Sequence, residues 1–141
     1  MFSNTGDPHG SQPAALAPAG VLGKISAVQK QIVFNELQSK LSLHFELVSQ
    51  EKFLRAQEAV FATLDISECT EEQCIRKIQE ALQVENILVL QMLRDGPDTQ
   101  LSLTLVALDN RVVETQYCEN CNTRALNHRV AGMVENLIRK R

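Results

Sequence analysis

The chain has 141 residues, of which 44% are hydrophobic and 22% charged, and its formal net charge at pH 7 is −3. This length and composition are typical of a globular chain with a single domain. The acidic balance excludes electrostatic attraction to nucleic acid, the 4% of aromatic residues offer few platforms for stacking bases, and no apolar run reaches the ~20 residues of a membrane-spanning helix.

The first 23 residues are rich in proline and glycine and poor in large apolar side chains. Such a segment buries too little surface to offset the entropy of ordering, so we expect residues 1–23 to be a disordered tail or linker and residues 24–141 to form one α+β domain. The segment lacks the basic start and apolar core of a signal peptide. A linker of this kind indicates that the natural protein is longer at this end.

Two helices and a short strand are predicted next. Apolar residues recur every three to five positions over residues 24–42, with Ser26 as the N-cap, and this spacing predicts a helix. The alternation in HFELVS, residues 44–49, predicts a short strand. Ser49 caps a second helix, which ends at residues 65–67 and buries Phe53, Ala56, Val60 and Leu64.

A third helix has the clearest start signal in the chain. Residues 70–73, TEEQ, form a capping box in which the threonine and glutamine side chains satisfy free amides of the first turn. The acidic cluster of Glu68, Glu71 and Glu72 suits the positive end of this helix and does not indicate a catalytic pair. The predicted buried face consists of Ile75, Ile78, Ala81 and Leu82.

Residues 86–117 predict three consecutive antiparallel strands, a meander on which the other elements pack. Residues 87–93 are apolar almost without interruption, which is typical of a central strand buried on both faces. Residues 101–108 alternate as a half-buried strand requires. Asp109–Asn110 tolerates positive φ and predicts a tight hairpin turn before a third strand over residues 111–117.

A last helix follows the meander, with Asn122 or Thr123 as its N-cap, and residues 139–141, RKR, complement its negative end. Its apolar stripe consists of Leu126, Val130, Met133, Val134, Leu137 and Ile138. The element order is α-β-α-α-β-β-β-α. It predicts an α+β fold in which helices pack on an antiparallel three-stranded meander plus one short strand.

This order of elements resembles a known domain. A helix, the strand HFELVS, a helix that starts with EKF, and the segment ECTEEQCIRKIQEALQVENILVLQ together resemble the amino-terminal α/β domain of TolB and the related domain of CsgG-type envelope lipoproteins. The segment LSLTLVALDNRVVETQ is similar to their hairpin. The resemblance covers roughly residues 30–138 as a pattern of elements. It implies a non-catalytic, envelope-associated interaction domain, although no strand is predicted before the first helix, where the family has one.

Four cysteines stand at two helix starts, and their placement favours two local disulfides. With a threonine N-cap between them, Cys69 and Cys74 occupy the N′ and N4 positions, which a hydrophobic staple brings into contact. Cys118 and Cys121 can close a tight loop at the last helix in the same way. Disulfides persist in oxidising compartments, so this pairing predicts a periplasmic or cell-envelope location, with any membrane association through an anchor outside this sequence.

Three other interpretations of the cysteines remain open. The C-x4-C and C-x2-C pairs could form a structural zinc site, although the gap between the pairs is long. Redox activity of Cys118-Glu119-Asn120-Cys121 is disfavoured because the glutamate opposes a thiolate. The thiols of a cytosolic protein would simply be reduced.

No other stretch indicates chemistry. His9, His44 and His128 share no ligand spacing, and neither a phosphate-binding glycine loop nor a G-x-S-x-G elbow is present in the sequence. We therefore expect no catalysis and no cofactor. The leading hypothesis is a protein-interaction or assembly domain that binds a protein partner or the remainder of a longer polypeptide. The alternative is a small intracellular domain with a structural zinc site.

Edge strands are the expected partner-binding elements because their unpaired amides and carbonyls accept a further strand. Two segments are candidates, residues 111–117 and residues 45–48. The first carries polar side chains that discourage promiscuous pairing, and these are the predicted partner-binding residues: Arg111, Glu114 and Gln116.

Overall fold

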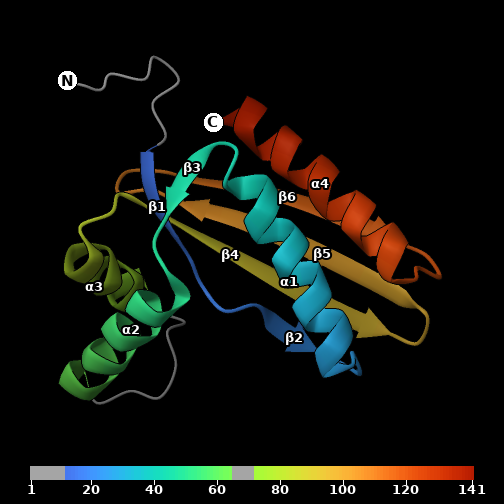
Figure 1. Ribbon diagram of the computed structural model, residues 1–141, viewed down its shortest axis with the longest axis horizontal. Coiled ribbons are helices and arrows are strands. Elements are labelled where there is room, and N and C mark those ends of the chain that lie inside the picture. The colour runs from blue at the N-terminus through green and yellow to red at the C-terminus, as the bar shows by residue number, and fades with distance from the viewer. Residues whose placement is uncertain (1–11, 65–71) are drawn as a thin grey trace.

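The computed structural model describes residues 12–64 and 72–141. One six-stranded sheet carries α1 and α4 side by side on one face, and α2 and α3 pack at one end of the molecule (Figure 1). The elements in chain order are β1 Gln12–Leu16, β2 Gly20–Leu22, α1 Ala27–Leu41, β3 Phe45–Leu47, α2 Gln50–Leu64, α3 Glu72–Leu82, β4 Asn86–Asp95, β5 Asp98–Val106, β6 Arg111–Cys118 and α4 Thr123–Lys140.

The sheet is mixed, with the strand order β3-β1-β4-β5-β6 and with β2 paired to β4 beyond the end of β1. Strands β4, β5 and β6 form the predicted antiparallel meander, whereas β1 pairs in parallel with β3 and β4. The predicted α+β class, the meander, the short strand and the helices packed on the sheet are confirmed. Strand β4 is central, as its continuous apolar sequence indicates.

The prediction of a disordered tail is wrong for residues 12–22, which form β1 and β2. Ala14, Ala15 and Leu16 are fully buried, since β1 lies inside the sheet between β3 and β4. The strand was not predicted because alanine and proline have a weak preference for strands. It is held in place by pairing with β3 on one side and β4 on the other. Residues 1–11 lie outside the described residues.

Two packed layers form the core, one on each face of the sheet. The larger joins α1 and α4 to alternate residues of β4 and β5, among them Leu88, Leu90 and Leu103. The smaller joins α2 and α3 to the opposite face through Phe53, Ile78, Ala15 and Ile87. Because successive strand residues point to opposite faces, neighbouring residues of β4 enter different layers.

Side-chain caps set the helix starts. Ser26 Oγ accepts from the Gln29 amide at 3.0 Å, and Asn122 Oδ1 accepts from the Ala125 amide at 2.9 Å, so Asn122 is the cap of α4. Ser49 Oγ likewise accepts from the third residue after it, at 3.2 Å. The predicted capping box at residues 70–73 begins outside the described residues.

The β5–β6 hairpin turns one residue earlier than predicted. The amide of Ala107 donates to the carbonyl of Asn110 at 2.9 Å, so Leu108 and Asp109 form the tip. Among the described non-glycine residues, positive φ is found at Gln83 and Asn120, not in this turn. The prediction of positive φ at Asp109–Asn110 is therefore wrong.

Gly23 follows β2 with φ +93°, and a Cβ at this position would clash with the carbonyl group of Arg94. We expect Gly23→Ala to lower the free energy of unfolding by about 1–3 kcal/mol, because it combines an unfavourable backbone conformation with a clash against β4. Urea unfolding would measure the loss.

The matched control is Gly132→Ala in α4, where nothing lies within 4 Å of the added methyl group. Alanine inside a helix is more favourable than glycine by about 0.5–1 kcal/mol, so this variant should unfold at higher urea. A Gly23→Ala protein as stable as the parent would show that β2 is not held against β4.

Candidate functional site

One face of the sheet is covered over only part of its width. Helices α2 and α3 pack over β1 and the first half of β4, where Ala15, Ile87 and Val89 meet them. The same face is open over β5 and β6, where Val113 is 45% exposed and Tyr117 is 55% exposed. The open half of the sheet therefore presents side chains that no described helix covers.

The open face is defined by strand pairing. Ser102 lies opposite Thr115, and their hydroxyl oxygens are 3.4 Å apart on the exposed side. The alternation of the two strands places these residues on this face: Asp98, Gln100, Ser102, Thr104 and the buried Val106 of β5, and Arg111, Val113, Thr115 and Tyr117 of β6. This set is mixed in character, with polar groups between two exposed apolar side chains.

Strand β6 forms one edge of the sheet, as predicted. The bond from Ala107 to Asn110 makes these residues a hydrogen-bonded pair, and such pairs alternate with non-bonded ones along antiparallel strands. Every odd-numbered residue from Arg111 to Tyr117 therefore directs its amide and carbonyl away from β5. The edge offers the backbone groups that an added strand would need.

The three predicted partner-binding residues lie on different faces of β6. Arg111 is exposed on the open face. Glu114 is buried toward α4 and pairs with Lys140, whose Nζ lies 3.1 Å from the carboxylate. Gln116 Oε1 accepts from Arg129 of α4 at 3.1 Å. The side chains of Glu114 and Gln116 are thus engaged by α4 and do not lie free at the edge.

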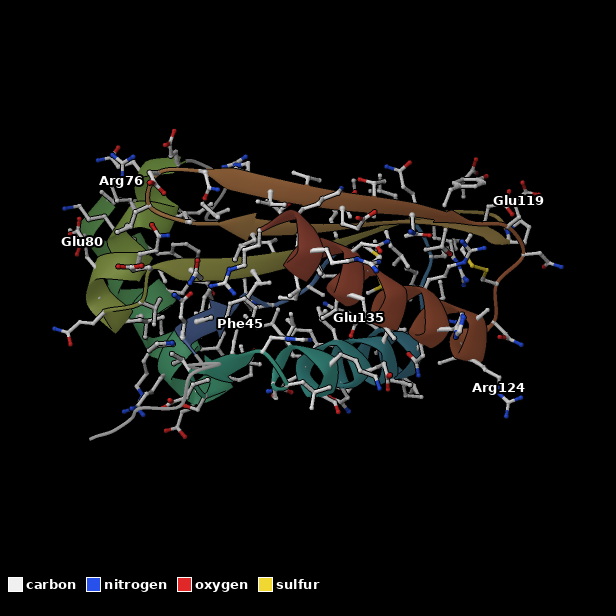
Figure 2. All side chains as sticks on the ribbon, turned by 90° about the horizontal axis from the view of Figure 1, so that it is seen from above. Phe45, Arg76, Glu80, Glu119, Arg124 and Glu135 are labelled. Carbon is white, nitrogen blue, oxygen red and sulfur yellow. A yellow bond between two sulfur atoms is a disulfide. The ribbon has the colours of Figure 1, made fainter. Side chains whose placement is uncertain are left out.

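The second candidate edge, β3, has three residues, Phe45–Leu47. Strand β3 is a sheet edge, but Phe45 is buried and the guanidinium of Arg141 lies over its ring, 4.8 Å from the centroid. Figure 2 shows Phe45 in the interior of the molecule. Strand β6 is therefore the longer and more accessible edge.

A hydrogen-bonded cluster lies at the far end of β6. The hydroxyl of Tyr117 donates to Asp98 Oδ2 at 3.0 Å, and the amide of Asn120 donates to Asp98 Oδ1 at 2.9 Å. The bond to Asp98 raises the pKa of Tyr117 above its ordinary value, and desolvation and the charges of Asp98, Glu119 and Asp95 act in the same direction. The cluster fixes the tyrosine ring at the rim of the open face.

The structure holds a disulfide between Cys118 and Cys121, whose Cα atoms are 5.8 Å apart. It closes the loop between β6 and α4, with Cys118 fully buried. Cys74 is also buried and disulfide-bonded. Its predicted partner, Cys69, lies outside the described residues, so that pairing stays a prediction.

Arg94 ties the disulfide loop to the rest of the domain. Its guanidinium donates to Thr99 Oγ1 at 3.2 Å, Gln29 Oε1 at 3.1 Å and the carbonyl of Cys121 at 3.2 Å. Gln29 Nε2 in turn donates to Thr123 Oγ1 at 3.1 Å. A single planar cation with several donors thus joins β4, β5, α1 and the start of α4.

An apolar groove of about 550 Å³ borders the open face and is lined by residues of α2, α3, β2 and β4. Gln91 belongs both to the groove and to the open side of β4, and Leu22, 61% exposed, forms its rim. Other residues that line it are Pro18, Phe53, Phe61, Ile75 and Val89. The groove extends the accessible surface from β6 across to β2.

Within residues 12–64 and 72–141, no group of three His, Cys, Asp or Glu residues is arranged to hold a metal ion. His44 Nε2 lies 3.9 Å from a carboxylate oxygen of Glu135, and His128 is exposed on α4. His9 lies outside the described residues, as do Glu68 and Glu71, whereas Glu72 pairs with Arg76 at 3.2 Å. None of the helices in the described part of the chain is long and apolar enough to cross a membrane.

The fold and its half-open sheet place this chain in the class of α+β domains with helices on a mixed sheet. The sequence matches no known protein family and no curated protein. Solved structures do share the fold. The C-terminal domain of LpoB from Salmonella enterica aligns with a TM-score of 0.58 at 12% identity, over 77% of this chain and 83% of that one.

Two further solved structures share the fold. The C-terminal domain of LpoB from Escherichia coli has a TM-score of 0.55 at 12% identity, over 79% of this chain and 84% of that one. Lipoprotein GNA1162 from Neisseria meningitidis has a TM-score of 0.52 at 12% identity, over 89% of this chain and 96% of that one. At this identity the likeness shows the fold alone. None of the three is named as a TolB or CsgG domain, so that resemblance stays a prediction.

Tyr117 is the only tyrosine of the chain, so phenolate absorbance reports its ionisation directly. We expect a titration midpoint above the ordinary tyrosine value, and a lower midpoint in Asp98→Asn, which removes the acceptor charge. Because the folded-state pKa is raised, the stability from this bond is present below about pH 10 and lost as the pH rises through the folded-state value.

Glu135→Gln is the control, since this carboxylate lies on α4, away from the disulfide end where Figure 2 shows Glu119. Its midpoint should equal that of the parent. An Asp98→Asn variant with an unchanged midpoint would contradict the contact between Tyr117 and Asp98.

Peptide mapping by mass spectrometry without reductant should give the pairs Cys118–Cys121 and Cys69–Cys74. Replacing Cys118 and Cys121 by alanine should lower the free energy of unfolding by about 2 kcal/mol, the chain-entropy value for so short a loop. A peptide that links Cys69 to Cys118 or Cys121 would exclude local pairing.

Proposed function

We propose that this chain is a non-catalytic interaction or assembly domain of the bacterial cell envelope that binds its protein partner through β6 and the open half of the sheet. The observation that carries the proposal is the uneven cover of the sheet. One face is sealed by α1 and α4, while the other is open from β5 to an edge strand whose outward backbone groups, apart from the Val113 carbonyl that Lys140 binds, are available for pairing. A sheet built in this way supplies both a surface and a strand edge for a partner.

The fold supports the envelope part of the proposal. The solved structures that share it come from three bacteria, and one of them is named a lipoprotein, a kind of protein that the envelope carries. The order of helices and strands from α1 onward is also the order on which the resemblance to the TolB amino-terminal domain rests. The proposal accordingly includes a TolB-like assembly role, although fold alone does not determine function.

The disulfide-bonded cysteines support a location in an oxidising compartment. A disulfide between Cys118 and Cys121 fixes the start of α4, and Cys74 is disulfide-bonded at α3. Disulfides of this structural kind persist in the periplasm and outside the cell. The alternative, an intracellular zinc site on the four cysteines, is less well supported because metal binding needs free thiolates, whereas Cys74, Cys118 and Cys121 are bonded to sulfur.

Site-specific photocrosslinking in the native cells tests the proposal. Benzoylphenylalanine at Tyr117 should give one discrete protein adduct, because this side chain lies on the open face next to the β6 edge. Arg76 on α3 is the matched control: its side chain is 57% exposed, and Figure 2 shows it at the opposite end of the molecule from Glu119. The control position should give no such adduct.

Two results would count against the proposed function. Equal labelling from both positions would indicate non-specific contact, and an adduct formed from Arg76 alone would place the partner on the α2–α3 side. Labelling of the Cys74, Cys118 and Cys121 thiols in unreduced cells would contradict the oxidising compartment.

A further inference from the structure

The β6 edge lies beside a cationic flank of α4. Ala125, Arg129, Gly132, Asn136 and Lys140 recur every three or four residues, so they lie along one side of the helix. Three contacts show that this side faces β6, since Arg129 binds Gln116 and Lys140 binds both Val113 and Glu114. We define the α4 flank as these five residues.

Lys140 already binds a backbone group of the β6 edge. Its Nζ donates to the carbonyl of Val113 at 3.0 Å, one of the outward-facing groups of β6, and lies 3.1 Å from Glu114. The side chain of Lys140 is 50% exposed, so the ammonium can also reach a group outside the domain. A lysine at this place both discourages promiscuous strand pairing and attracts an anionic strand.

The charge along the edge is positive although the whole chain is acidic. Arg111, Arg129 and Lys140 border β6, and the carboxylate of Glu114, with a side chain only 10% exposed, offsets one of them. The carboxylates of Asp98, Glu119 and Asp95 surround Tyr117 at the other end of the strand and oppose the positive charge there. An incoming strand therefore meets a net positive border between Arg111 and Gln116.

There is also room for an acidic side chain beside the α4 flank. A cavity of about 360 Å³ lies between β6 and α4 and is lined by Gln116, His128, Arg129 and Gly132. Gly132 leaves it open because no side chain projects there, and nothing lies within 4 Å of its Cβ position. A carboxylate placed in this cavity would lie next to the guanidinium of Arg129.

We propose that the partner is an extended acidic segment of another protein, which pairs with β6 as an additional strand and places alternate carboxylates along the α4 flank. The inference rests on the proposed function and names the chemistry of its partner. Side chains of an added strand alternate between the two faces. Those on the α4 side meet Arg129 and Lys140, whereas those on the other side meet Val113, Thr115 and Tyr117 and should be apolar or β-branched.

Fluorescence anisotropy with synthetic peptides tests this directly. The probe is a labelled octapeptide that alternates glutamate and valine, and the control peptide has glutamine in place of each glutamate. We expect saturable binding of the acidic peptide that weakens as salt is raised, and at least tenfold weaker binding of the control. An N-methylated acidic peptide, which cannot donate to β6, should not bind.

Matched protein variants separate the backbone from the charge contribution. Thr115→Pro removes an outward amide and leaves the β5–β6 bonds in place, so it should abolish binding, whereas Thr115→Val, which keeps this amide, should retain saturable binding. Arg129→Gln should weaken binding by up to about fivefold, the range for an exposed ion pair. The N-methylated peptide gives the same information if Thr115→Pro fails to fold.

Several outcomes would overturn the inference. Equal affinity for the glutamate and glutamine peptides would reject the acidic partner, and unimpaired binding of the N-methylated peptide would reject strand addition. Binding of phosphatidylglycerol vesicles in place of the peptide, unaffected by Thr115→Pro, would assign the cations to a lipid surface. A specific crosslink from Tyr117 without any peptide binding would leave the proposed function intact and reject this partner chemistry alone.

Discussion

The whole arrangement depends on burying the first half of β4 on both of its faces. This strand pairs with β1 and β2 on one side and with β5 on the other, and its alternate residues enter two separate apolar layers. A doubly buried strand cannot leave its backbone groups unpaired, because each one would cost the free energy of a lost hydrogen bond. The parallel strands near the start of the chain are therefore needed to complete the sheet around β4.

The two layers differ in extent, and the open surface is a consequence. Helices α1 and α4 are 15 and 18 residues long and lie together across one face, whereas α3 has 11 residues and packs with α2 at one end of the other face. The meander continues beyond the cover of α2 and α3. Arg94 and the Cys118–Cys121 disulfide tie its far end to α1 and to the start of α4.

Local sequence patterns were sufficient to predict the described elements that have a strong apolar periodicity or a side-chain cap. The continuous apolar run of β4, the alternation of β5 and the caps at Ser26 and Asn122 each produce structure through neighbours in the chain, and the structure contains them. Strand β1 lacked such a signal. Its alanines have little preference for a strand, and Ala14 is ordered only because β3 and β4 flank it.

By itself the sequence determined the α+β class, the meander, the starts of α1, α2 and α4, and β6 as a candidate edge, because periodicity and capping act over a few residues. Tertiary structure alone decided which side of β6 meets α4. It turned Glu114 and Gln116 toward Lys140 and Arg129, and it left the face of Tyr117 open. Helix α4 follows β6 closely in the chain, but its angle across the sheet is set by long-range packing with α1, which no local pattern encodes.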